Sequence, residues 1–343
     1  MRFAYFTDIH LREGYDSDLG FERCLGSMLA HEPQLLVCGG DLGVTPEAVT
    51  LYREMTAGIP VPILLSNGNH EICSGYLPRD QAGTAHTSCD LDGVHFVMLD
   101  VVRYFEPTES HPWNWHVVAD ERMLRWLAED LSEVDRETPL IVACHVPAST
   151  TFPARMGQTP GMEFPTNEIA NAAQLLDLIR PFSHVATLHG HDHENCRHFV
   201  DHIEIMTTAA VAGNWWRNGL DSPCRWGREP QGYRIVDVAD DGTITSRYVA
   251  LTPEQDEPAE AFHDLESGRR FLNVYDASPR TVVEAQELGV LSPIDPLDTT
   301  SSHLATHLYE LPAEYGQDRL SVSVTFKDGR DTEKMTLALF DLE

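Results

Sequence analysis

The sequence predicts an α/β fold followed by a small all-β domain. Over roughly the first 250 of its 343 residues, short apolar runs typical of buried strands alternate with amphipathic stretches of helical periodicity. The composition changes after Val249, where proline and acidic residues become frequent and later runs are separated by turns rather than helices. We therefore expect an α/β domain at 1–250, a linker at 251–268 and a β-sandwich-like domain at 269–343.

The strands of the first region are expected at nine apolar runs. Helical stretches separate the early runs, which predicts βαβ units, and the later runs predict sheets that pack face to face between helices. The runs are Phe3–Thr7, Leu35–Cys38, Ile63–Leu65, Val94–Leu99, Leu140–Cys144, Val185–Leu188, His202–Thr207, Tyr233–Val238 and Thr243–Val249.

Capping residues and periodicity mark the helices. Thr45 is a predicted N-cap, because Pro46 follows it at the first helical position. Asp120 precedes a stretch with apolar side chains at positions 123, 124, 127 and 131, which is helical spacing. A third helix is expected at Ala170–Ile179, before Pro181.

Two stretches between these elements look irregular, at Val102–His116 and Pro147–Pro165. We expect them to be long loops that wall or cover a substrate site, as long loops in compact domains often do. The strands of the second domain are expected at Phe271–Tyr275, Leu304–Leu311, Leu320–Phe326 and Met335–Leu342.

Charge and composition restrict the class of protein. The chain carries 24 basic and 54 acidic residues, a net charge of −30, which argues against nonspecific binding to DNA or RNA. No apolar run approaches the ~20 residues of a membrane-spanning helix. No signal-peptide pattern precedes the first predicted strand, so we expect a cytoplasmic protein with reduced, buried cysteines. A Cys144–His145 nucleophile–base pair is disfavoured, because neighbours along a strand point to opposite faces.

Five short motifs follow in a fixed order, each directly after an apolar run. Seven of their side chains offer the oxygen and nitrogen donors that divalent metals prefer, and none is a thiolate. The motifs are Asp8-Ile9-His10, Gly39-Gly40-Asp41, Gly68-Asn69-His70, His145 and Gly190-His191-Asp192-His193.

The spacing within the motifs suits a pair of metal ions. Asp8 and His10 are two residues apart at a strand end, so their side chains should point the same way and grip one cation. His191 and His193 have the same spacing. Asp41 has two carboxylate oxygens and can bridge two cations about 3.5–4 Å apart. Further donors follow other strands at Asn69 and His145.

Such a site predicts phosphoester hydrolysis. Two cations lower the pKa of a shared water toward ~7 and clamp phosphoryl oxygens, so a metal-bridging hydroxide is the expected nucleophile. His70 follows Asn69 and is not needed as a ligand, so we expect it to be the general acid. The motifs do not choose between a phosphodiesterase and a phosphatase. A nuclease and a non-catalytic scaffold are the alternatives; the acidic charge disfavours the first and the complete donor set disfavours the second.

These motifs resemble those of the calcineurin-like metallophosphoesterase superfamily, whose pattern is D-x-H, G-D, G-N-H-D/E, H and G-H-x-H. The resemblance implies a four-layer sandwich of two mixed β-sheets flanked by helices. It implies two divalent metal ions, with Mn, Fe or Zn expected, and a catalytic role for His70. Glu71 stands where aspartate is commoner, which leaves its supporting role open. The implied ligands are Asp8, His10, Asp41 and His193 for one metal, and Asp41, Asn69, His145 and His191 for the other.

A later stretch is similar to bacterial members of this superfamily that carry a C-terminal β domain. It runs from Gly213-Asn214-Trp215-Trp216 to Pro230-Gln231-Gly232-Tyr233, and the part from His307-Leu308-Tyr309 to Asp328-Gly329-Arg330 resembles that domain. We expect Trp215, Trp216 and His116 to contact substrate; an aromatic plug under the domain junction is the alternative for the tryptophans. The expected substrate is a small phosphorylated molecule, and a nucleotide is one candidate because its base could stack on aromatic rings.

Overall fold

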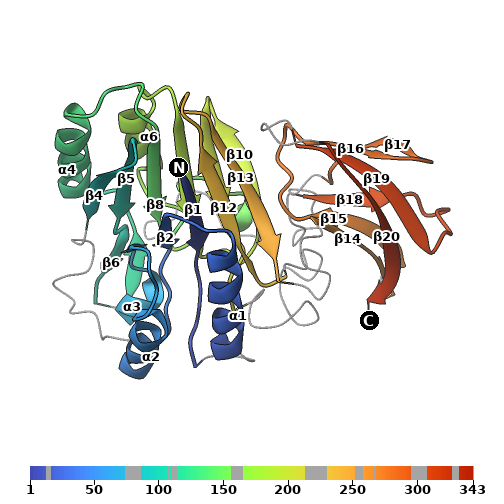
Figure 1. The fold of residues 1–343 in the computed structure, drawn as a ribbon, viewed down its shortest axis with the longest axis horizontal. Coiled ribbons are helices and arrows are strands. Elements are labelled where there is room, and N and C mark those ends of the chain that lie inside the picture. Colours follow the sequence, from blue (N-terminus) through green and yellow to red (C-terminus); the bar gives the residue numbers. More distant parts are fainter. Residues whose placement is uncertain are drawn as a thin grey trace.

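The computed structural model describes residues 1–12, 17–73, 86–106, 109, 114–155, 165–212, 230–251, 258–265, 268–294, 307–326 and 332–342. Figure 1 shows an α/β region, which contains the first thirteen strands, beside a region of strands alone. The α/β fold and the all-β C-terminal region were both predicted, and both predictions are confirmed. No helix in the described ranges has the length and apolar character needed to cross a membrane.

The first sheet has five strands in the order β13-β12-β1-β2-β3. The last three of this order pair in parallel, and the other two pairings are antiparallel, so the sheet is mixed. Its strands are β1 (Arg2–Phe6), β2 (Leu35–Cys38), β3 (Ile63–Leu65), β12 (Gly232–Val238) and β13 (Ile244–Ala250).

The second sheet has six strands in the order β10-β11-β9-β8-β5-β4, with parallel pairing in the centre and antiparallel pairing at both edges. Its strands are β4 (Thr87–Leu91), β5 (Val94–Leu99), β8 (Leu140–Cys144), β9 (Val185–His189), β10 (Cys196–Val200) and β11 (Ile203–Thr207). All nine strands predicted for the first region are present, each within one residue at either end. The edge strands β4 and β10 were missed, because polar residues interrupt their apolar runs.

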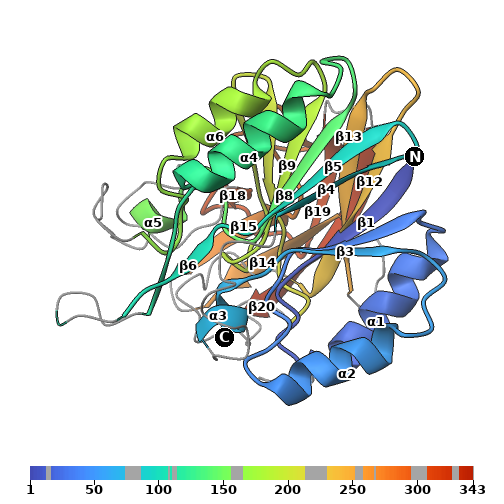
Figure 2. The same ribbon diagram turned by 90° about the vertical axis from the view of Figure 1, so that its left-hand side faces the viewer.

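Side-chain alternation places the two sheets face to face. Phe3 and Tyr5 of β1 belong to the cluster between the sheets, where Phe3 meets Phe96 edge-to-face at 5.2 Å between ring centroids. Ala4 and Phe6 point the other way, into the cluster beneath the helices. Figure 2 shows the result, with α1 and α2 on one side of the sheets and α4 and α6 on the other. These are the predicted four layers.

The helices are α1 (Ser17–Ala30), α2 (Pro46–Thr56), α3 (Asn69–Cys73), α4 (Glu121–Ser132), α5 (Phe152–Arg155) and α6 (Ala172–Ile179). The predicted caps are confirmed: Thr45 Oγ1 accepts from Ala48 N at 3.2 Å, and Asp120 Oδ1 accepts from Met123 N at 2.8 Å. Helix α1 was not predicted.

The prediction of an irregular stretch at 102–116 was wrong in part. Its two ends pair as a short antiparallel hairpin, β6 (Val102–Tyr104) and β7 (Trp115–Val117). Each strand has three residues, too few for alternation to show in the sequence.

The C-terminal strands form one sheet in the order β17-β16-β19-β20-β14-β15-β18. A sandwich of separate sheets was predicted, but the long strand β20 joins the two groups: residues 333–338 pair with β19, and 339–342 pair with β14. Strand β14 lies inside the expected linker at 251–268, so we propose that the β region begins at Ala259. The strands are β14 (Ala259–Asp264), β15 (Arg269–Val274), β16 (Val282–Ala285), β17 (Gly289–Leu291), β18 (Leu308–Leu311), β19 (Arg319–Thr325) and β20 (Glu333–Leu342).

One carboxylate joins this sheet to the α/β region. Asp276 Oδ1 lies 2.6 Å from an amino group of Arg234, whose side chain is fully buried in β12. Asp276 Oδ2 accepts from Arg197 at 3.2 Å and from the backbone N of Tyr248 at 3.1 Å. The buried guanidinium of Arg234 thus depends on a residue that follows β15.

Candidate metal centre

All seven predicted ligands follow strands of the two facing sheets, at the carboxyl ends of those strands. The parallel strands of both sheets end at the same edge of the α/β region, so loops distant in sequence meet there. Asp8 and His10 follow β1, Asp41 follows β2, Asn69 follows β3, His145 follows β8, and His191 and His193 follow β9.

The loops aim these side chains through unusual backbone angles. Left-handed φ values, which are uncommon outside glycine, cost of order 1 kcal/mol and cluster at functional sites. The prediction that strand alternation would align Asp8 with His10 was therefore wrong in its reason, since both residues lie beyond the end of β1. Five of the seven have a φ between 48° and 71°: Asp8, His10, Asp41, His191 and His193.

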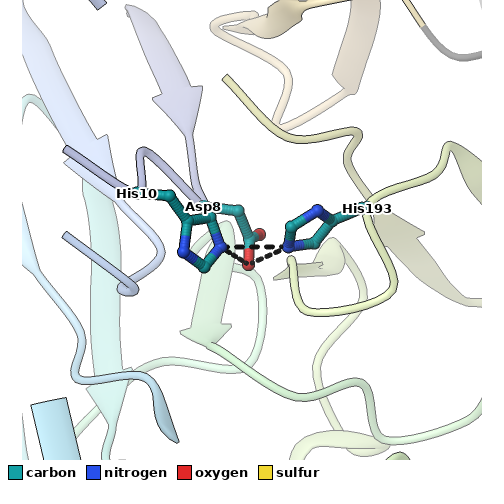
Figure 3. Close-up of side chains that lie close together, drawn as sticks. All are labelled: Asp8, His10 and His193. Carbon is teal, nitrogen blue, oxygen red and sulfur yellow. Dashed lines mark hydrogen bonds and ion pairs between the residues drawn. The ribbon is translucent and has the colours of Figure 1, made fainter. Parts of the chain in front are cut away.

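Asp8, His10 and His193 form the first cluster, drawn in Figure 3. The carboxylate of Asp8 points between the two rings, whose Nε2 atoms lie 3.1 Å apart. Asp8 Oδ1 is 3.3 Å from His193 Nε2 and 3.9 Å from His10 Nε2. This buried oxygen accepts no hydrogen bond within the described residues, so it is available to a cation.

The other oxygen of Asp8 fixes the carboxylate. Asp8 Oδ2 accepts from Thr7 Oγ1 at 2.8 Å and from the backbone N of His191 at 3.0 Å. A Cβ on Gly190 would overlap this oxygen, so glycine is required at that position for close approach. The φ of Gly190 is not left-handed, so glycine is needed here for the space beside Asp8 and not for its backbone angle.

Asp41, His145 and His191 form the second cluster. His145 Nε2 lies 3.2 Å from Asp41 Oδ2 and 3.1 Å from Asn69 Oδ1. His145 Nδ1 donates to the carbonyl of Gly39 at 2.9 Å, which directs the ring's other nitrogen toward the cluster.

Asp41 stands between the two clusters. Its Oδ1 accepts from the backbone N of His70 at 2.9 Å. Its Oδ2 lies 3.2 Å from His145 Nε2, in the second cluster, and 3.9 Å from His10 Nε2, in the first. Donor atoms that share one cation at about 2.1 Å are about 3.0–3.4 Å apart, a range that includes the separation from His145 and is exceeded by the separation from His10.

Glu71 holds the loop that carries Asp41. Its carboxylate is buried and accepts from three backbone N–H groups: Gly68 at 2.5 Å, Asp41 at 3.1 Å and Leu42 at 2.7 Å. Burial and the nearby charge of Asp41 raise the pKa of Glu71. The sequence left the role of Glu71 open, and the structure assigns it to holding two motifs together.

The side chain of His70 is more exposed than those of His10, His145 and His193. Its side chain is 20% exposed, against 3% for His193 and 0% for His10 and His145. His70 Nε2 lies 3.8 Å from Asp41 Oδ2, and its ring meets that of His10 edge-on at 4.5 Å. The nearness of His10, Asp41 and His70 also permits ligation by His70.

The electrostatics of the centre suit positive ions. Burial opposes the ionised forms of Asp8 and Asp41, but the neighbouring imidazoles outweigh it and hold both carboxyl pKa values below their usual range. Burial also opposes the charged form of His145, but Asp41 and Asp8 raise the pKa of His145 to about 10. Burial and the charge of His145 lower the pKa of His191 to about 3, so that ring is neutral. Ionised carboxylates and inward-facing nitrogens therefore fit divalent cations.

Of the three residues predicted to contact substrate, the structure describes His116. Alternation along β7 sends Trp115 and His116 to opposite faces. Trp115 meets His191 edge-on at 5.8 Å between centroids, whereas His116 packs against Phe105 at 5.3 Å. The β7 side chain next to His191 is thus Trp115, and contact between His116 and substrate stays a prediction. Trp215 and Trp216 lie outside the described residues.

Cys144 is not paired with His145. Its Sγ lies 3.3 Å from Nδ1 of His189, and burial raises the pKa of the thiol above its ordinary value. A protonated, buried thiol is not a nucleophile, as the sequence indicated.

The chain is similar to one known protein family and to several solved structures. A family model described as calcineurin-like phosphoesterase matches residues 1–195. A dimetal phosphatase from Danio rerio is 15% identical, with a TM-score of 0.48, covering 69% of this chain and 94% of that one. Plasmodium GAP50, described as the anchor in the inner membrane complex, is 12% identical, with a TM-score of 0.49 and coverages of 74% and 85%. A putative 5'-nucleotidase from Staphylococcus aureus is 12% identical, with a TM-score of 0.43; the match covers 75% of this chain and 54% of that one. No curated protein matches the chain.

Proposed function

The chain belongs to the calcineurin-like phosphoesterase family, and from that premise we propose that it is a two-metal hydrolase of a phosphomonoester or phosphodiester. The observation that carries the two-metal proposal is the position of Asp41 Oδ2, which lies within 3.9 Å of His10 Nε2 and within 3.2 Å of His145 Nε2. One carboxylate oxygen thus faces both clusters. When bound, two divalent ions would supply an acidified water and neutralise charge on phosphoryl oxygens.

The two clusters divide the proposed ligands. Asp8, His10 and His193, with Asp41, would hold one ion; Asp41 with Asn69, His145 and His191 would hold the other. Support comes from the short separations between their donor atoms and from the buried Asp8 Oδ1, which accepts no hydrogen bond in the described part of the chain. Mn, Fe or Zn suit a set of carboxylate, amide and imidazole donors.

His70 would donate a proton to the leaving oxygen. Its partly exposed ring stands beside Asp41 and lies next to the proposed ligand Asn69, so it can reach a substrate held at the cations. His70→Ala should reduce turnover by about 10²–10⁴-fold while two ions stay bound. Loss of an ion from His70→Ala, measured by elemental analysis after dialysis, would instead assign His70 as a ligand.

The substrate class is tested most directly with two chromogenic esters. The diester bis(p-nitrophenyl) phosphate and the monoester p-nitrophenyl phosphate should be compared with added Mn²⁺ and with EDTA. Metal-dependent cleavage of either ester supports the proposed function, and the preferred ester separates a phosphodiesterase from a phosphatase. Failure to cleave both, by protein that carries two ions, would contradict general phosphoesterase activity.

A nucleotide-like substrate remains a prediction. The aromatic residue described at the centre, Trp115, is 8% exposed and covers His191, so it does not offer a free face for a base. A panel of nucleotides against simple sugar phosphates tests the prediction.

A further inference from the structure

Asn167 contacts a proposed metal ligand through its side-chain amide. Its Oδ1 lies 2.9 Å from Nε2 of His191. Neither the sequence motifs nor the family pattern include this asparagine, which lies in the segment before α6.

The backbone around Asn167 is held on both sides. Pro165 O accepts from Val117 N at 2.9 Å, Ile169 N donates to Pro147 O at 3.2 Å, and Ala170 N donates to Val117 O at 3.1 Å. The segment is therefore tied to β7 and to the loop after β8. These bonds fix where the amide stands relative to the ring of His191.

The hydrogen bond assigns the proton on that ring. An amide oxygen only accepts, so Nε2 of His191 must donate. A neutral imidazole carries one proton, so Nδ1 then keeps its lone pair and can bind a cation. His145 is oriented in a comparable way in the same cluster, since its Nδ1 donates to the carbonyl of Gly39 and its Nε2 faces Asp41 and Asn69.

Among the described residues, the hydrogen-bond partner of the His191 ring is Asn167 Oδ1. The backbone N of His191 donates to Asp8 Oδ2 at 3.0 Å, which fixes the main chain but not the orientation of the ring. Trp115 and His145 meet the ring edge-on, at 5.8 and 5.2 Å between centroids. These contacts limit where the ring lies, whereas Asn167 determines which nitrogen carries hydrogen.

We propose that Asn167 is a positioning residue that sets the orientation and tautomer of His191 for binding the second metal ion. The inference rests on the proposed two-metal function. Hydrogen-bond partners of metal-bound histidines typically change metal affinity by about 10–100-fold when they are removed. The same loss is expected here, confined to one of the two ions.

The test is titration of metal-depleted protein with Mn²⁺, followed by calorimetry and elemental analysis. Asn167→Leu keeps the side-chain size but has no hydrogen-bond acceptor. It should lower the affinity for one ion by about 10–100-fold and leave the affinity for the other unchanged. Asn167→Asp keeps an acceptor and should bind both ions within a few-fold of the unmodified protein.

Thr150→Val is the matched control. It removes a hydrogen bond of 2.8 Å from the neighbouring segment to Asp192, the residue next to His191 that is not a proposed ligand. This variant should bind both ions normally. Equal loss in Thr150→Val and Asn167→Leu would show general loosening of the loops and would overturn the assignment.

A second readout does not depend on metal. Long-range ¹H–¹⁵N spectra of metal-free protein should show the Nε2–H tautomer of His191, and Asn167→Leu should lose that pure pattern. If Asn167→Leu binds both ions as tightly as unmodified protein, the role of Asn167 is refuted while the two-metal function stands. If the unmodified protein itself binds fewer than two ions, the proposed function fails.

Discussion

Removing the carboxylate of Asp276 should destabilise the α/β region, although this residue lies in the C-terminal β region. Asp276 is the ion-pair partner that the described structure gives to Arg234, whose side chain is fully buried in β12. It also receives an N–H from Tyr248 of β13 and an amino group of Arg197. Arg197 keeps a second carboxylate, that of Glu204 at 2.5 Å. The variant Asp276→Ala thus leaves the charge of Arg234 without an ion-pair partner among the described residues, whereas Arg197 keeps one.

The expected magnitude follows from these contacts. Breaking a buried ion pair from one side costs about 3–5 kcal/mol, because the remaining charge has no partner. The backbone N–H of Tyr248 would also lose its acceptor, which adds about 1–3 kcal/mol for a buried donor. We expect Asp276→Ala to lower the free energy of unfolding by about 4–8 kcal/mol, a large part of the 5–15 kcal/mol typical of a folded protein.

The assay is urea-induced unfolding followed by circular dichroism and tryptophan fluorescence. Asp237→Ala is the control, since Asp237 also makes a two-contact pair with an arginine, Arg2, but at side-chain exposures of 43% and 47%. That exposed pair should contribute no more than about 1 kcal/mol. Combining Asp276→Leu with Arg234→Met should recover most of the loss, because no charge is then left unpaired. A loss in Asp276→Ala no larger than in Asp237→Ala would refute the reasoning.

Three further predictions concern the metal centre. Gly190→Ala should abolish tight binding of one ion, because the new Cβ overlaps the carboxylate of Asp8. Elemental analysis measures the bound metal, and Gly58→Ala is the control, since a Cβ there meets nothing within 4 Å. Glu71→Gln presents an amide N–H₂ to backbone donors and should cost about 1–3 kcal/mol in urea unfolding, so an unchanged midpoint would count against the three-bond clamp. Without metal, the pKa of His145 is raised from 6.5 to about 10 in the folded protein, so its stabilisation is complete below pH 6.5 and is lost as pH rises through about 10. The free energy of unfolding of EDTA-treated protein should therefore fall over this window by up to about 1.4 kcal/mol per pH unit, which lowers its melting temperature. His145→Gln should make the melting temperature less dependent on pH.

Much of the fold and the site could be predicted from local patterns. Buried central strands such as β2 and β8 are continuous apolar runs, so their positions agree with the prediction to the residue. The caps at Thr45 and Asp120 depend only on neighbouring residues, and both are confirmed. The edge strands β4 and β10, the hairpin β6–β7 and strand β14 were missed, because short strands and strands with polar residues are stabilised by pairing with other strands rather than by an apolar pattern of their own.

The sequence by itself determined which donor groups gather at the centre, because motif residues that follow parallel strands must emerge at one edge of the sheets. The tertiary structure decided how they meet. Left-handed turns aim Asp8 and His10, and such turns persist only where surrounding contacts over-determine them. Distant contacts likewise make Glu71 a clamp, Asn167 a partner of His191 and Asp276 the counter-charge of Arg234. None of these pairings has a local signature, because each depends on where two separate segments are placed by the packing of the whole chain.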